Sequence, residues 1–326
     1  MKKVLLLAPR LDVMFKKGEV PHTRGPITPI RVHWKNFIDR VVAEYSNRQD
    51  ISFKILELPL WQITPELVNE LNPDIVFIPH KENHNFPVEN CEVYYYMQTS
   101  FPWMFSVDSK GWAAGSSRYP FDDFTNESDD AEIFNMLKKR MNDNQSKFDQ
   151  PAHKENLFLP DYYAFFPCQI PHDETIKFHS KVTVQEALER TCIATKDGTI
   201  NLVVKGHPVN PGSMQSLKEI AKKYSHVSWY DDVSIHQLLS KARCTVTVNS
   251  GVGFESLLHE IPVVTFGRSE YDSVTYKVDD KTNLEKTISL ASDNFFDLSK
   301  TCKFYNHWWK YCYNTQNDND FHRLPK

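Results

Sequence analysis

Two short segments in the second half of the chain constrain its fold more than any other feature. Residues 203–208 read Val-Val-Lys-Gly-His-Pro, and residues 245–255 read Thr-Val-Thr-Val-Asn-Ser-Gly-Val-Gly-Phe-Glu. Each begins with β-branched residues and then changes to polar residues and glycine, which is typical of a buried parallel strand that opens at its carboxyl end. Ligands of open α/β sheets bind at those ends. The two segments therefore predict an α/β sheet with a ligand site at one edge.

Composition excludes several classes of protein. The chain has 326 residues, of which 40% are hydrophobic and 25% charged, and a formal net charge of −4. This length and composition are those of a globular protein with two domains. The charge indicates no basic surface, so no nucleic-acid partner is expected. No apolar run approaches the roughly 20 residues of a membrane span, and the leucines at 5–7 are expected in a first buried strand and not in a signal peptide.

The cysteines indicate a reducing compartment. None of the six forms a Cys-x-x-Cys pair, and no group of His and Cys has the spacing of a zinc site. We therefore expect a cytoplasmic location and no structural metal. No magnesium ion is expected, because no carboxylate cluster marks a site for one, and we expect no cofactor. Peripheral attachment to the inner face of the membrane through an amphipathic surface stays open.

Strand and helix patterns alternate along the chain, which predicts parallel βαβ units in two Rossmann-like halves. We expect an N-terminal domain over 1–150, a C-terminal domain over 151–300, and a tail over 301–326 that packs back on the domains; the polar segment 142–155 is expected to be the linker. The expected strands are 4–7, 51–58, 74–79, 93–97, 162–167, 201–205, 227–230, 262–266 and one beginning at Thr245, and the expected helices include 131–141, 182–194, 213–224 and 252–259.

Lys205, His207 and Pro208 stand at the end of the first segment. Proline fixes its own φ and has no backbone N–H, so Pro208 is expected to end the strand and to leave His207 at its mouth beside Lys205. An imidazole and an ammonium there can donate hydrogen bonds to a phosphate oxygen that gains charge as a sugar departs. The alternative is an ordinary His-Pro turn with a solvated lysine.

Asn249 begins the run Asn-Ser-Gly-Val-Gly ahead of a predicted helix. Ser250 can cap that helix, whose free N–H groups form an anion site, and Gly251 and Gly253 allow a ligand to approach the backbone. Glu255 lies near the first turn, where a carboxylate can accept hydrogen bonds from ribose hydroxyls. The alternatives are a plain strand–helix turn and an acid that only favours the helix N-terminus.

Residues 167–176 read Pro-Cys-Gln-Ile-Pro-His-Asp-Glu-Thr-Ile and follow the first predicted strand of the second half. This order places them at the floor of a cleft that we expect between the two predicted halves, with the neighbouring acids Asp173 and Glu174 on a loop. One carboxylate there can act as a nucleophile or as a general base. The residues alone favour the alternative, in which Asp173 caps a helix.

A long segment over 98–124 is expected to be a loop, and its aromatic residues argue against disorder. Trp112 can stack on a sugar ring, and Arg118 supplies a cation. Both are therefore candidates for substrate binding, at the place where a second substrate that accepts a sugar would approach. The alternative is a packed surface loop.

Together these motifs resemble those of the bacterial capsule-polysaccharide and lipopolysaccharide β-Kdo transferases. Members carry a Pro-x-Gln-x-x-x-Asp-x-Ser/Thr-Ile segment, a Lys-x-His-Pro segment, an Asn-Ser-x-x-Gly-x-Glu segment and a Pro-Val-Val-x-x-Gly strand. In this chain they are 167–176, 205–208, 249–255 and 262–267, in the same order. The resemblance covers roughly the second half. The His-Pro and serine motifs are also similar to those of bacterial sialyltransferases, which likewise use CMP-activated acidic sugars.

The resemblance implies a GT-B fold, with a cleft between two Rossmann-like domains and the donor CMP-Kdo bound mainly by the C-terminal one. It implies transfer to a glycan or glycolipid acceptor with retention of configuration, through an adduct on the aspartate that the motif places at Asp173. His207 and Ser250 would hold the CMP phosphate, with Lys205 beside them, and Glu255 the ribose. Gln169, in the first motif, is expected among the substrate-binding residues.

In the first half the resemblance is weaker. Related capsule enzymes have an acidic Glu-Asp-Gly-Phe-type segment after the fourth strand, whereas residues 97–102 here read Met-Gln-Thr-Ser-Phe-Pro. The acceptor and the linkage therefore do not follow from the motifs. Two other classes stay open: an inverting sialyl or UDP-sugar transferase in which Asp173 acts as the base, and a non-catalytic protein that binds nucleotide sugars or glycans.

Overall fold

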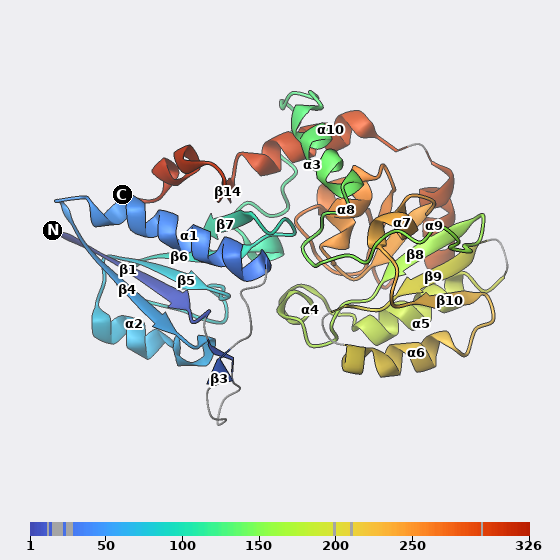
Figure 1. The fold of residues 1–326 in the computed structure, drawn as a ribbon, viewed down its shortest axis with the longest axis horizontal. Helices are drawn as coiled ribbons and strands as arrows, with labels where there is room; N and C mark the ends of the chain where they lie inside the picture. The colour runs from blue at the N-terminus through green and yellow to red at the C-terminus, as the bar shows by residue number, and fades with distance from the viewer. Residues whose placement is uncertain (12, 15–21, 24–28, 198–199, 209–210, 295) are drawn as a thin grey trace. The chain divides into compact units, whose positions relative to one another are not determined.

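The chain forms two compact units (Figure 1). Unit 1 comprises residues 1–119 and 311–326, and unit 2 comprises residues 120–310. Among the described residues each unit contains a six-stranded sheet flanked by helices, which confirms the predicted class of two Rossmann-like α/β units. The computed structural model describes residues 1–11, 13–14, 22–23, 29–197, 200–208, 211–294 and 296–326.

The boundary between the units lies after Tyr119, whereas the sequence predicts it at residue 150. Residues 120–150 belong to unit 2 because helix α3 (Glu132–Asn142) packs on α10 (Leu298–Trp309). The expected tail is also divided: α10 belongs to unit 2, whereas residues 311–326 belong to unit 1.

Unit 1 has the strand order β14-β7-β6-β5-β1-β4. Strands β1, β4, β5 and β6 are parallel, β7 and β14 add antiparallel pairs at one edge, and β2 and β3 form a separate antiparallel pair. The elements are β1 (Lys2–Pro9), β2 (Val13–Met14), β3 (His22–Thr23), α1 (Pro29–Ser46), β4 (Ile51–Leu58), η1 (Leu60–Gln62), α2 (Pro65–Leu71), β5 (Ile75–Pro79), β6 (Glu92–Gln98), β7 (Met104–Asp108), η2 (Ala113–Gly115), β14 (Cys312–Asn314) and η5 (Asp318–Arg323).

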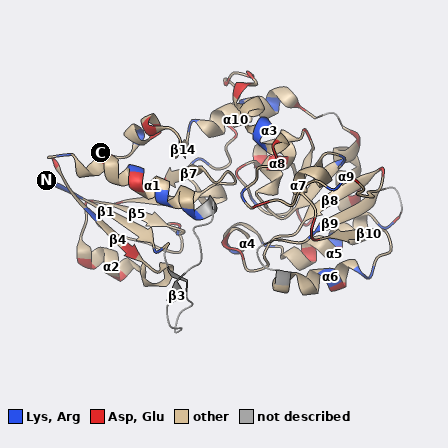
Figure 2. Cartoon of the chain, viewed as in Figure 1, with Lys and Arg blue, Asp and Glu red and all other residues tan. Residues whose placement is uncertain are grey.

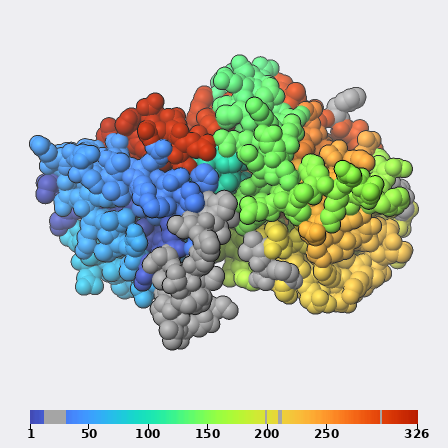
Figure 3. Space-filling model, in the orientation of Figure 1, coloured from blue at the N-terminus to red at the C-terminus, as the bar shows by residue number. Residues whose placement is uncertain are grey.

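Strand β7 lies inside the segment 98–124, so the prediction of a loop there is wrong for residues 104–108. The strand is too short for its own periodicity to be recognised, and its stability comes from packing. Phe105 stacks on Phe37 of α1 with ring centroids 4.4 Å apart. Helix α1 also contacts η5 of the C-terminal segment, whose red atoms lie beside the blue ones of α1 in Figure 3.

Unit 2 has the strand order β10-β9-β8-β11-β12-β13, and all of its ladders are parallel. The sequence patterns indicated neither β13 nor α9. Acidic and basic residues are mixed along the helices and loops of both units, whereas the buried central strand β8 contains no charged residue (Figure 2). The elements that follow α3 are β8 (Tyr163–Pro167), α4 (Glu174–His179), α5 (Val184–Ala194), β9 (Asn201–Lys205), η3 (Pro211–Met214), α6 (Gln215–Ala221), β10 (Val227–Tyr230), α7 (Ile235–Leu239), β11 (Cys244–Thr247), α8 (Val252–Leu258), β12 (Val263–Thr265), η4 (Asp272–Val274), β13 (Tyr276–Lys277), α9 (Leu284–Asp293) and α10.

The strand order of unit 2 reverses between β8 and β11. From β8 the chain moves outward to β9 and β10, and it then returns to place β11 on the other side of β8. Loops that leave such neighbouring strands in opposite directions open a crevice at their carboxyl ends, which is where doubly wound sheets bind ligands.

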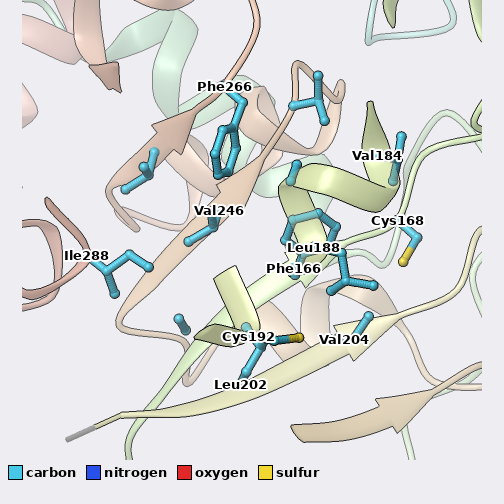
Figure 4. Packing of buried hydrophobic residues seen from close by; sticks show 14 of the residues in the cluster. Phe166, Cys168, Val184, Leu188, Cys192, Leu202, Val204, Val246, Phe266 and Ile288 are labelled. Atoms are coloured by element: carbon cyan, nitrogen blue, oxygen red, sulfur yellow. The ribbon is translucent and has the colours of Figure 1, made fainter. Parts of the chain in front are cut away.

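A buried core fixes these strand ends. Phe166, Val204 and Val246 from three adjacent strands pack with Leu188 of α5 and Ile288 of α9, and all five side chains are buried (Figure 4). Each such side chain contributes about 1.5–3 kcal/mol through its burial. The polar residues that follow the strands therefore start from a rigid base.

Candidate functional site

Gln169 and Asn249 join the two loops at the switch point of unit 2. The Gln169 side-chain amide donates to Asn249 Oδ1 (3.0 Å), and Gln169 Oε1 accepts from the Asn249 backbone N–H (3.1 Å). Asn249 Nδ2 donates to the carbonyls of Thr175 (2.9 Å) and Arg268 (3.3 Å). Both donors of the Asn249 amide are thus engaged within the protein. The two side chains hold the loops around the site, and their direct contact with a ligand stays a prediction.

Asp173 is the N-cap of α4, as the alternative interpretation of its segment predicts. Its Oδ1 accepts hydrogen bonds from the Thr175 backbone N–H (2.8 Å) and from the Thr175 hydroxyl (2.7 Å). Both bonds fall on one oxygen, so Oδ2 accepts none from the described residues. A cap does not exclude chemistry, because it holds the carboxylate in one orientation with its second oxygen available as a nucleophile or base.

His207 lies half-buried just beyond the end of β9. Its ring makes an edge contact with Phe148, with centroids 5.0 Å apart. Burial lowers the pKa of His207 to about 4, and the charge of Asp173 opposes this shift. The imidazole is therefore neutral at pH 7 and offers one N–H donor but no positive charge.

Lys205 is buried, and its ammonium donates to the Asp231 carbonyl (2.9 Å) beyond the end of β10. Burial also lowers its pKa. The ammonium thus braces two neighbouring strand ends, and its expected action beside His207 stays a prediction. Pro208 follows the strand and is exposed.

The turn before α8 is shaped by Tyr271. The Tyr271 hydroxyl donates to the Ser250 carbonyl (2.5 Å), and Ser250 Oγ accepts from the Val252 N–H (3.2 Å). A Cβ atom on Gly253 would overlap the Tyr271 ring. Glycine at 253 therefore makes room for a buried tyrosine, whereas the sequence suggested room for a ligand. Gly251 is half-buried and has helical backbone angles (φ −54°, ψ −22°).

Glu255 is 4% exposed, and its Oε1 accepts a hydrogen bond from the Ser146 hydroxyl. Burial raises the pKa of Glu255 to about 7, although the bond from Ser146 and the charge of Lys147 both act in the opposite direction. A carboxylate that already accepts one hydroxyl can accept another of the same kind. The expected ribose contact therefore stays a prediction.

The sequence missed a segment that reaches this site. Residues 144–150, which we call the strap, were predicted to lie in a linker. Ser234 donates to Asn144 Oδ1 (2.5 Å), and the Ile235 N–H donates to Gln150 Oε1 (3.0 Å), so both ends of the strap are tied to α7. The polar side chains at its ends accept hydrogen bonds from α7, whereas the sequence suggested polar residues exposed to solvent between two domains.

Lys147, in the middle of the strap, acts electrostatically on three carboxylates. It is half-buried, and burial lowers its pKa, while the charges of Asp173, Glu270 and Glu255 oppose that shift. Glu270 is buried and accepts a hydrogen bond from the Trp308 indole N–H (3.0 Å), and burial raises the pKa of Glu270 to about 7. No sequence motif marks Lys147. The only available signal for Glu270 was its position shortly after the end of β12.

These two glutamates contribute a loss of stability as pH rises from 5.5 to 8, and it is opposed by a gain from His207, His236 and His259, whose pKa values are lowered by burial. The folded-state pKa of each lies near 7 against 4.5 for the free side chain, so between these values the folded protein binds more protons than the unfolded chain. The stabilisation is complete below pH 4.5 and is lost as pH rises through 7. Each residue contributes about 2 kcal/mol of this change. Glu255→Gln should remove the contribution of Glu255, so that its free energy of unfolding, measured by calorimetry, falls by about 2 kcal/mol less between pH 5.5 and 8 than that of the wild type.

The matched control is Glu285→Gln, which changes an exposed glutamate in the first turn of α9. It should leave the pH dependence of the free energy of unfolding as in the wild type. Equal pH dependence in Glu255→Gln and the wild type would contradict the prediction.

Trp112 and Arg118 belong to unit 1 and lie outside the constellation of unit 2. The Trp112 side chain is 3% exposed, so in this structure it offers no face for stacking on a sugar. Arg118 is exposed, and its guanidinium lies 3.5 Å from the centre of the Tyr311 ring. Asp108 orders the loop between them by accepting hydrogen bonds from the Ser117 N–H (2.8 Å) and other donors. Their roles in substrate binding stay predictions.

Among the residues that the structure describes, no group of three or more His, Cys, Asp or Glu side chains is arranged to hold a metal ion. Within the same residues, each helix is too short or too polar to cross a membrane.

The family model described as "capsule polysaccharide biosynthesis protein" matches residues 123–304. The chain belongs to this family. The match includes the strap, Asp173, His207 and the turn before α8, and it confirms the family that the sequence motifs indicated.

Curated relatives match over shorter segments. The capsule polysaccharide export protein KpsS of Escherichia coli is 31% identical over 84 residues, which are 23% of this chain and 22% of that protein. The capsule polysaccharide modification protein LipB of Neisseria meningitidis is 27% identical over 124 residues, 34% of this chain and 30% of that protein. The chain thus aligns with less than a third of the length of these relatives.

Two solved structures share the fold. One is described as Thermosulfurimonas dismutans KpsC, β Kdo 2,7 transferase, with a TM-score of 0.51, 14% identity and coverage of 93% of this chain and 90% of that chain. The other is the KpsC β Kdo 2,4 transferase of the same organism, with a TM-score of 0.50, 15% identity and coverage of 84% and 85%. These likenesses show that the two Rossmann-like units follow the GT-B plan.

Proposed function

We propose that this chain is a glycosyltransferase of capsule polysaccharide synthesis that transfers Kdo, or a related acidic ketose, from a CMP-sugar to a glycan acceptor. The observation that carries the proposal is the meeting of Asp173, His207 and the Ser250 turn at the switch point of unit 2. The loops that bear Asp173 and Ser250 are joined by the bonds between Gln169 and Asn249, and the charge of Asp173 acts on His207. Family membership and the shared fold with two β Kdo transferases support the same activity.

In this proposal the donor phosphate lies near His207, whose neutral imidazole donates one N–H to it. Ser250 lines the same turn, and Glu255 accepts a ribose hydroxyl in addition to the Ser146 hydroxyl that it already binds. Phosphate stabilisation is assigned to protein donors, so we expect turnover without an added metal ion.

The reaction follows in two displacements. A carboxylate oxygen of Asp173 forms a bond to the anomeric carbon, and the bond from that carbon to the phosphate oxygen breaks, so that CMP leaves with the electron pair. An acceptor hydroxyl then bonds to the same carbon and gives its proton to solvent water, while the bond from that carbon to the Asp173 oxygen breaks and the carboxylate leaves with the electron pair. Two inversions at one carbon give net retention.

Calorimetric titration with CMP, UDP and GDP tests the donor class. CMP should bind more tightly than UDP or GDP, and His207→Ala should weaken CMP binding by about ten- to a hundredfold, because a hydrogen bond to a charged phosphate contributes about 1.5–3 kcal/mol. His226→Ala is the matched control, since His226 precedes β10 at the opposite end of the sheet and contacts Thr195. Absence of CMP binding to the wild type would refute the proposed donor.

A further inference from the structure

Lys147 lies between two residues of the proposed donor site because both of its neighbours in the strap are fixed there. On one side, the Ser146 hydroxyl donates to Glu255 of α8. On the other side, the Phe148 ring contacts the His207 ring at 5.0 Å. These two contacts hold the backbone of Lys147 over the carboxyl edge of the sheet, between α8 and the end of β9.

Three basic residues that the structure describes at or after the ends of β9 and β12 are uncharged or bonded within the protein. His207 is neutral at pH 7 because burial lowers its pKa to about 4. The Lys205 ammonium donates to the Asp231 carbonyl (2.9 Å), and the Arg268 guanidinium donates to the Phe178 carbonyl (3.2 Å). An anionic phosphate at this edge therefore needs a positive charge that these three side chains do not direct towards it.

Three carboxylates make this need stronger. Asp173, Glu255 and Glu270 all act electrostatically on Lys147, and in their ionised forms they would repel a nucleotide phosphate unless a cation lay among them. The same carboxylates favour the charged form of the half-buried lysine and so oppose the effect of its burial.

From this placement we infer that Lys147 binds the phosphate of the donor nucleotide and supplies the positive charge that His207 lacks. The inference rests on the proposed function, because it takes a nucleotide sugar as the ligand. It assigns a binding role to a segment that the sequence presents as a linker. Its chemistry is that of an ammonium on a flexible stem, which can turn from the carboxylates to a phosphate without movement of the backbone.

The test compares CMP with cytidine, which lacks the phosphate, in calorimetric titrations of the full chain. Lys147→Met should weaken CMP binding by about ten- to a hundredfold and leave cytidine binding unchanged, because only CMP carries the group that the ammonium binds. Lys147→Arg, which keeps the charge, should retain most of the affinity for CMP.

Lys154→Met is the matched control. It makes the same substitution a few residues beyond the strap, where the exposed Lys154 ammonium pairs with Asp232 (3.3 Å), and it should bind CMP as the wild type does. Far-ultraviolet circular dichroism and Tm establish that each variant is folded.

Each other result overturns the inference. Unchanged CMP affinity in Lys147→Met would remove Lys147 from the phosphate site while the proposed donor stands. An equal loss of CMP and cytidine binding would show that the lysine only maintains the site. A wild-type protein that binds no CMP would refute the donor class, and the role of Lys147 with it.

Discussion

Asp173→Asn is expected to lower kcat by about a thousandfold or more while the fold and CMP binding are retained. An amide cannot form the glycosyl ester that the proposed reaction requires. It can keep the cap of α4, because its carbonyl oxygen still accepts from the Thr175 N–H, which now lies 2.8 Å from Asp173 Oδ1. Asp173→Ala would in addition lose the cap, at a cost of about 1 kcal/mol. The asparagine variant therefore separates the chemistry from the structural role.

The control is Asp297→Asn, the same substitution at the N-cap of α10, where the side chain accepts from the Lys300 N–H (2.9 Å). It should leave kcat unchanged. Mass spectrometry of the wild type after incubation with donor should find the sugar mass on the peptide that contains Asp173. An active wild type that never yields this adduct would favour inversion with Asp173 as the base, and full turnover by Asp173→Asn would exclude both roles.

Gly253→Ala should destabilise unit 2 by about 3 kcal/mol, near the upper end of the range for an overpacked core. The added methyl group would overlap the Tyr271 ring, which is 2% exposed and therefore has little space to move. The Tyr271 hydroxyl is also held by the Ser250 carbonyl, so a displaced ring would distort the turn that carries Ser250. CMP affinity should fall together with stability.

Urea denaturation followed by tryptophan fluorescence measures this loss as a lower midpoint. Gly251→Ala is the matched control, because Gly251 is half-buried with helical backbone angles that alanine adopts readily. An unchanged midpoint in Gly253→Ala would mean that Tyr271 has room to shift and that the glycine serves another purpose.

The fold class could be predicted from local patterns because the spacing of apolar residues within each strand or helix shows which of its faces is buried. The strand expected at 201–205 and the helix expected at 182–194 are examples, and both are elements of the structure. Strand β7 could not be predicted in this way, because it is short and depends on its pairing with β6 and on the contact of Phe105 with Phe37.

The candidate site was predicted in part. The motifs around Asp173, His207 and Ser250 follow strand ends, and topology alone brings such residues to one edge. The roles of single side chains were less predictable: Gly253 accommodates Tyr271, and the Lys205 ammonium braces the Asp231 carbonyl. These outcomes depend on which atoms meet across long stretches of chain.

The sequence by itself determined that two α/β units form and that a set of polar residues gathers at the carboxyl edge of the second, because hydrophobic periodicity and strand order are local properties. Only the tertiary structure decided that the segment thought to be a linker lies over this edge and brings Lys147 near Glu255 and Glu270. Its polar side chains could equally well have been hydrated or hydrogen-bonded to α7. The hydrogen bonds to α7 form because folding of the whole unit brings α7 next to the segment, and the residues of the segment alone do not determine this.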